Sequence, residues 1–267
     1  MKSIGVIAKT LFLFLIGKFV VLFGVNSMFS FYYKATTDSG ELSELTLNHA
    51  ANISTLLSSI LILVVLFYWK PLKGLKDSWK KITPIFLSLV LFLGLLGFAL
   101  NSVVLSFFKS PYEEAIELSK SLLNSGWISV LGVALFVPIV EEVIFRRICI
   151  ESLKKEMGVV PAILVSAIVF GILHINPIQI LGATLLGLLF GCIYELSKSV
   201  LPGILLHVFN NGMYVYKLRF DKMETSSVFF TKENPYIWLV VSLLCVLFMV
   251  TAYFAYKQRV KSEDINL

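Results

Sequence analysis

The sequence predicts an all-α membrane protein of about eight transmembrane helices that enclose a polar intramembrane cavity. Of its 267 residues, 57% are hydrophobic and 15% are charged, and the mean hydropathy is +0.86. A soluble domain usually carries about 25% charged residues. Apolar runs recur at about 20 residues, the length that crosses a hydrocarbon core of about 30 Å. Charged and polar side chains inside some of these runs predict the cavity.

Eight apolar runs are the candidate spans. They lie near residues 9–30, 50–69, 82–108, 126–150, 159–176, 178–196, 199–216 and 236–256. The first resembles a secretory signal, because lysines precede an apolar run. It is too long for one, contains Lys18 and lacks a small-residue cleavage site, so we expect a retained span.

The distribution of lysine and arginine predicts the orientation. With both termini in the cytoplasm, the inside segments carry about twice as many of these residues as the outside segments, as membrane proteins generally do. We expect a multi-pass integral membrane protein, surrounded by lipid, with both termini in the cytoplasm. The same loops account for the net charge of +6, so no nucleic-acid partner is predicted.

The three cysteines show no framework for disulfides or metal. Cys149, Cys192 and Cys245 each lie in or beside an apolar run, with no Cys-x-x-Cys pair. Free cysteine in such a place behaves as a small buried hydrophobe. The chemistry of the chain is therefore expected from its glutamates and histidines.

Two adjacent glutamates, Glu141 and Glu142, lie inside the fourth apolar run. A charge at the bilayer centre costs roughly 2.5–3.5 kcal/mol on insertion scales, so such residues usually have a function. Glu142 and Arg146 are four apart on one helical face and should form a structural ion pair. Glu141 points about 100° away and would face a cavity as general base or acid. Alternatively, both glutamates pair with Arg146 and Arg147 and have no catalytic part.

His174 ends the fifth run, and Phe170 one turn earlier would brace its ring. A lone histidine at the end of a span is more often a satisfied interfacial residue. However, Pro161 and Pro177 leave about 15 residues between them, roughly 23 Å of helix. The turn after His174 would then lie at membrane depth, lined by protein or a wet cavity, which would bring His174 towards Glu141.

His207 and Asn211 are four apart in the seventh run. They share one helical face, and a histidine with a carboxamide makes a suitable donor pair for an oxyanion. Asn210 points about 100° away and is expected to form a packing hydrogen bond. Independent packing roles are the alternative for these polar residues, but we favour a joint active site.

These residues, in this order, resemble the motifs of the CPBP intramembrane proteases. The motifs are Glu141-Glu142-x-x-x-Arg146, Phe170-x-x-x-His174 and His207-x-x-x-Asn211, over roughly a quarter of the chain. That family includes the CAAX prenyl endopeptidases and bacterial Abi proteins linked to bacteriocin processing or self-immunity. The resemblance implies that Glu141 and His174 activate a water molecule and that His207 and Asn211 stabilise the oxyanion. Glu142, Arg146 and Phe170 would hold the site's geometry.

The resemblance also implies a domain organisation and raises the question of a metal. Residues 1–125 would be N-terminal transmembrane helices, 126–216 the CPBP-type catalytic core, and 217–267 a loop and a C-terminal transmembrane helix. The family is often labelled metalloprotease, and Glu141, His174 and His207 would supply ligands for zinc. No His-Glu-x-x-His motif is present, and a metal-free water activated by glutamate fits as well. Metal dependence therefore stays open.

The leading hypothesis is an intramembrane endopeptidase that hydrolyses a membrane-associated peptide or protein. The first alternative is a non-catalytic immunity protein that binds a membrane-active peptide in the same cavity. Such a protein would not need Glu141. The second is a transporter or channel with a Glu/His proton relay, which the absence of repeated halves makes less favoured.

Overall fold

The computed structural model describes residues 2–36, 44–68, 127–174 and 176–220, with residues 92, 94, 95 and 97 between them. Every regular element in these ranges is a helix, which confirms the all-α class. The predicted span at 236–256 lies outside the described residues, as does that at 82–108 apart from the four single positions. Nearly all of the predicted segment 217–267 lies outside them too.

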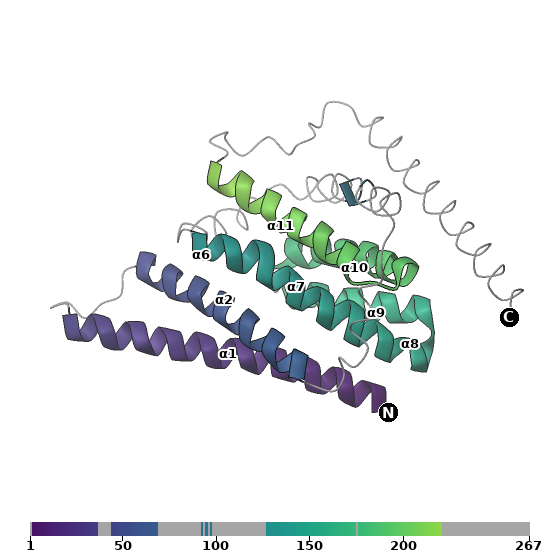
Figure 1. The fold of residues 1–267 in the computed structure, drawn as a ribbon, viewed down its shortest axis with the longest axis horizontal. Coiled ribbons are helices and arrows are strands. Elements are labelled where there is room, and N and C mark those ends of the chain that lie inside the picture. The colour runs from purple at the N-terminus through teal and green to yellow at the C-terminus, as the bar shows by residue number, and fades with distance from the viewer. Residues whose placement is uncertain are drawn as a thin grey trace, which may run out of the picture.

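Two long helices form an antiparallel pair at the N-terminal side of the molecule (Figure 1). They are α1 (Lys2–Thr36) and α2 (Glu44–Tyr68). Their apolar stretches, Gly5–Tyr32 and Thr46–Tyr68, match the first two predicted spans, and Gln179–Ser197 matches the sixth. By length and composition these three stretches cross a membrane, so the chain is an integral membrane protein. The total of eight spans stays a prediction.

One helix runs unbroken from Trp127 to Met157 through the middle of the molecule (Figure 1). It comprises α6 (Trp127–Val130), the π-helical η2 (Leu131–Phe136), α7 (Val137–Glu142), the π-helical η3 (Val143–Ile150) and α8 (Glu151–Met157). π-Helical turns are rare and often lie near functional sites. All residues of η3 except Arg147 are buried, so this helix carries its charges into the interior.

Three further helices follow: α9 (Val159–Ile172), α10 (Pro177–Ser197) and α11 (Leu201–Phe220). Gly158 reverses the chain between α8 and α9 at a φ of +85°, which glycine adopts without steric cost. With 14 residues, α9 spans roughly 21 Å, less than a hydrocarbon core of about 30 Å. The chain therefore leaves α9 after a helix shorter than that core, and the position of the following turn at membrane depth stays a prediction.

The central helix is enclosed by its neighbours. It contacts α1 and α2 on one side, α11 on another, and α9 and α10 through η3 and α8. Helices α9 and α10 pack closely because Gly187 faces Ala167, whose Cα lies 3.1 Å from where a Cβ of residue 187 would stand. Small residues allow such close approach between membrane helices. This arrangement brings α7, η3, α9 and α11 together around the predicted site.

Candidate active site

Glu142, at the end of α7, is the centre of a buried ionic cluster. Its Oε2 lies 3.2 Å from Nε of Arg146, and its Oε1 lies 3.0 Å from Nδ1 of His207. Glu142 is 0% exposed, Arg146 1% and His207 4%. The ion pair that the four-residue spacing predicted is therefore present. Its contact with His207, from a helix 65 residues away in sequence, was not predicted.

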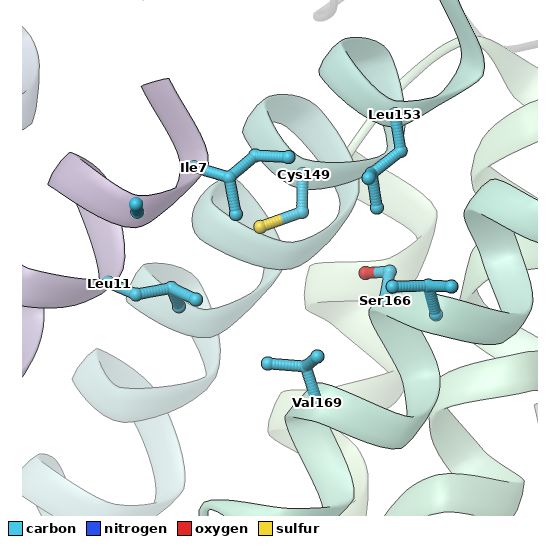
Figure 2. Close-up of a pocket in the computed structure, with 8 residues that line it drawn as sticks. Ile7, Leu11, Cys149, Leu153, Ser166 and Val169 are labelled. Atoms are coloured by element: carbon cyan, nitrogen blue, oxygen red, sulfur yellow. The ribbon is translucent and has the colours of Figure 1, made fainter. Parts of the chain in front are cut away.

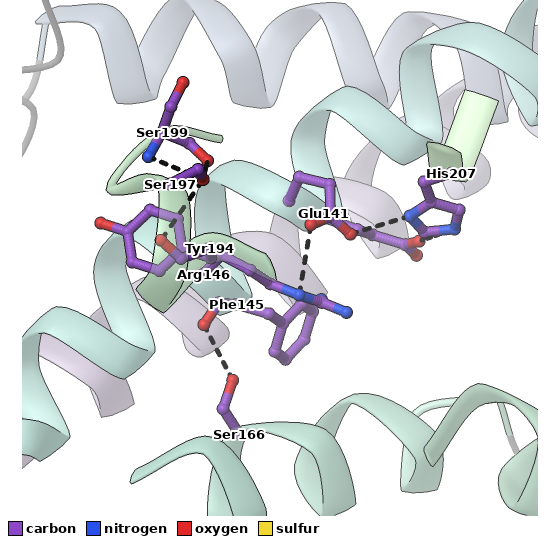
Figure 3. Close-up of polar contacts among 9 residues, drawn as sticks. Glu141, Phe145, Arg146, Ser166, Tyr194, Ser197, Ser199 and His207 are labelled. Atoms are coloured by element: carbon purple, nitrogen blue, oxygen red, sulfur yellow. Dashed lines mark hydrogen bonds and ion pairs between the residues drawn. The ribbon is translucent and has the colours of Figure 1, made fainter. Parts of the chain in front are cut away.

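His207 lies between two carboxylates. Its Nε2 is 3.7 Å from Oε2 of Glu141, while Nδ1 faces Glu142. An ionised carboxylate only accepts hydrogen bonds, so Nδ1 carries a hydrogen and donates a hydrogen bond to Glu142. Figure 3 shows Glu141 and His207 directed towards one another. Both glutamates thus reach one imidazole, although they leave the helix about 100° apart.

The formal charges of this cluster balance when His207 is an imidazolium. Glu141 and Glu142 contribute two negative charges, and Arg146 and His207 then contribute two positive ones. Buried charges are tolerated where they are paired, and removal of one partner leaves the other uncompensated. The four side chains therefore form one interdependent unit.

Aromatic rings enclose the cluster. The guanidinium carbon of Arg146 lies 4.7 Å from the ring centre of Phe170 and 5.5 Å from that of Phe190. The Phe190 ring is also 5.3 Å from the ring of His207. Cation–π contacts of this kind are stronger when the cation is desolvated. Phe170 was predicted to support the site, whereas Phe190 has no sequence signal, because it is one apolar residue in an apolar run.

His174 reaches the cluster through Phe170. Its Nδ1 lies 3.0 Å from the carbonyl oxygen of Phe170, and its ring is 4.9 Å from the Phe170 ring. A carbonyl only accepts, so Nδ1 donates and Nε2 is left to accept a proton or a hydrogen bond. On its other side, Phe170 lies 5.9 Å from the His207 ring. The structure places His207 against Glu141, and the pairing of His174 with Glu141 stays a prediction.

Asn211 is fixed by the helix opposite. Its Nδ2 donates to the carbonyl of Val133 in η2 at 3.0 Å. In the π-helical pattern the N–H that would bind this carbonyl belongs to residue 138, which is proline and has none. Asn210 donates to Oδ1 of Asn211 at 3.0 Å, so it orients that carboxamide. Pro138 thus leaves free the carbonyl that holds Asn211.

A zinc site of three protein ligands does not fit this arrangement. Among the described residues, no three His, Cys, Asp or Glu side chains are grouped as a metal ion would need. Structural and catalytic zinc sites take at least three protein ligands. Glu141, His174 and His207, the predicted set, therefore do not form one as placed.

A cavity beside η3 is lined by residues other than those of the ionic cluster (Figure 2). It has a volume of about 230 Å³ and lies between α1, the junction of η3 with α8, and α9. Its walls are Ile7, Ala8, Leu11, Cys149, Leu153, Val165, Ser166 and Val169. The hydroxyl of Ser166 donates to the carbonyl of Phe145 at 2.8 Å, so the lining is apolar. The polar cavity expected at Glu141 stays a prediction.

Comparison with known proteins supports the motif assignment. Residues 123–213, about a third of the chain, match the model of the type II CAAX prenyl endopeptidase Rce1-like family. A protein of Bacillus subtilis named "Putative membrane peptidase YdiL" is 33% identical over 78 residues. That alignment covers 29% of this chain and 32% of the relative, so the chain matches about a third of that protein's length. No solved structure matches. The resemblance to the CPBP family is thereby confirmed for the segment that carries the cluster.

Proposed function

We propose that this chain is an intramembrane endopeptidase that hydrolyses a peptide bond of a membrane-associated substrate. The observation that supports this most directly is His207 held between the carboxylates of Glu141 and Glu142 in a buried site. Carboxylates and imidazoles within reach of one another are the groups that general acid–base catalysis requires. The family match over residues 123–213 favours peptide hydrolysis over proton transport.

In the proposed mechanism, Glu141 accepts the proton of a water molecule as that water attacks the scissile carbonyl. Nε2 of His174 accepts a hydrogen bond from the same water and orients it. Glu141 then gives this proton to the leaving amine. The same carboxylate thus serves first as general base and then as general acid. Glu141 suits this role because its only close ionic partner among the described residues is His207, at 3.7 Å.

The oxyanion of the tetrahedral intermediate would be stabilised by His207 and Asn211. As an imidazolium, His207 would donate Nε2–H to the oxyanion while its Nδ1–H stays hydrogen-bonded to Glu142. Asn211 has two N–H groups, and the Val133 carbonyl takes one of them. Donors fixed in advance in a dry site stabilise developing charge strongly, typically by about 2.7–4 kcal/mol for one donor. Glu142, itself paired with Arg146, would hold His207 in place.

The substrate, its setting and the orientation are part of the same proposal. The family's name suggests a CAAX-type substrate, and the resemblance to Abi proteins suggests bacteriocin processing or self-immunity. We propose a peptide or protein segment in a bacterial plasma membrane, with both chain termini cytoplasmic. The excess of basic residues in the predicted inside segments supports that orientation.

Peptidase turnover by the purified protein in detergent tests the proposal. Wild type is compared with Glu141→Ala, His174→Ala and His207→Ala on a diverse peptide pool. His49→Ala is the matched control, because His49 is the third histidine and lies on α2, outside the cluster. We expect cleavage by wild type and His49→Ala and a loss of at least about 100-fold in the other three. Equal cleavage by Glu141→Ala and wild type would refute the mechanism.

A further inference from the structure

Gly203 lies in the first turn of α11, one turn before His207 on the same helical face. A Cβ on Gly203 would stand 2.7 Å from Oε2 of Glu142 and 3.4 Å from its Cδ. Real Cβ atoms essentially never come within 3.0 Å of another heavy atom. With any larger residue at position 203, either the Glu142 carboxylate or α11 would therefore have to shift.

Each oxygen of the Glu142 carboxylate has a partner that would be disturbed if the carboxylate moved. Its Oε1 is held by Nδ1 of His207 at 3.0 Å and its Oε2 by Nε of Arg146 at 3.2 Å. A methyl group at position 203 would force the carboxylate to rotate away from one partner or force α11 to move outward. Rotation of the carboxylate would weaken its contact with His207 or Arg146, and movement of α11 would displace His207, which is on that helix.

We propose that Gly203 is a positioning residue, which sets the depth at which α11 packs on α7 and so holds His207 between Glu141 and Glu142. Its consequence for turnover rests on the proposed function. Its consequence for the contact between Glu142 and His207 does not.

Helix propensity makes the inference testable, because it favours alanine over glycine inside a helix. Gly203→Ala would therefore be neutral or stabilising if no contact opposed it. Gly212 provides a matched control on the same helix, since a Cβ there meets nothing within 4 Å. A difference between Gly203→Ala and Gly212→Ala isolates the contact with Glu142.

The first readout is the ¹⁵N-histidine NMR spectrum of the full chain in detergent micelles. With three histidines in the chain, the His207 signals are assigned by their loss in His207→Ala. We expect the strongly hydrogen-bonded Nδ1–H of His207 in wild type and Gly212→Ala, and a weakened or lost signal in Gly203→Ala. Adding Glu142→Asp to Gly203→Ala withdraws the carboxylate by one methylene and should restore the signal.

The second readout is turnover of a peptide cleaved by the wild type. A misplacement of about 1 Å can cost about 100-fold, so we expect kcat of Gly203→Ala to fall by roughly 10–100-fold with KM nearly unchanged. Glu142→Asp should recover part of that loss in the Gly203→Ala background.

Three outcomes would overturn the inference. The first is an unchanged His207 signal in Gly203→Ala. The second is a Gly203→Ala/Glu142→Asp double variant that restores neither the signal nor turnover. The third is a failure of both Gly203→Ala and this double variant to fold. A Gly203→Ala protein that folds only when Glu142→Asp is added would support it. If wild type cleaves nothing, the proposed function fails, but the NMR comparison still decides the role of Gly203.

Discussion

Glu142→Gln should destabilise the protein more than any other conservative change at the site. Glu142 is 0% exposed and Arg146 1%, and their atoms lie 3.2 Å apart. Removal of one partner of a buried ion pair costs about 3–5 kcal/mol, because the other charge stays buried without compensation. The amide still accepts a hydrogen bond from His207, so the loss is chiefly that of the charge opposite Arg146.

A double-mutant cycle with Arg146→Met tests this reasoning. In the double variant neither the carboxylate nor the guanidinium remains, and replacement of both members of a buried pair is often close to neutral. The double variant should therefore lose less stability than Glu142→Gln alone, despite the loss of cation–π contacts to Phe170 and Phe190 worth about 0.5–2 kcal/mol each. Reversible unfolding in mixed detergent micelles provides the free energies. Additive losses, or a loss below about 1 kcal/mol for Glu142→Gln, would refute the reasoning.

Two further predictions concern packing and pH. Gly171→Ala places a Cβ 2.0 Å from Oγ1 of Thr184 and should lower the free energy of unfolding by about 1–3 kcal/mol through overpacking. Gly24→Ala is the control, because a Cβ there meets nothing within 4 Å. Thermal unfolding of both variants tests this difference. Burial alone would raise the pKa of Glu151, but the hydrogen bond and charge of Lys154, with further contacts, hold it below the usual value of 4.5. This carboxylate therefore stabilises the fold above about pH 4.5, and the contribution is lost as pH falls through the lower folded value. Unfolding measured from pH 6 to 3 should show a shallower acid limb in Glu151→Gln than in wild type, and equal slopes would contradict the assignment.

Local spacing made part of the site predictable. Glu142 with Arg146 and Phe170 with His174 are each four residues apart, and helical periodicity alone places such pairs on one face. The structure shows both contacts. The apolar composition likewise predicted an all-helical membrane protein, because a bilayer admits helices whose backbone groups are satisfied internally.

Contacts between helices could not be predicted in this way. Which nitrogen of His207 meets Glu142 depends on how α11 is rotated and how deeply it packs, and no periodicity within one helix fixes either quantity. Gly203 becomes informative only once Glu142 lies beside it. The link from Pro138 to Asn211 required the π-helical pattern of η2, which apolar residues do not signal.

Glu141→Gln in the purified protein is the measurement that tests the central claim most directly. The change keeps the size of the side chain and removes its capacity to accept a proton, so it separates catalysis from binding. We predict that Glu141→Gln binds a peptide substrate of the wild type with a Kd close to the wild-type value. It should hydrolyse that peptide at least about 100-fold more slowly. Hydrolysis at the wild-type rate would contradict a catalytic Glu141. Immunity of cells to a membrane-active peptide that persists in Glu141→Gln would do the same, and would favour a protein that only binds this peptide.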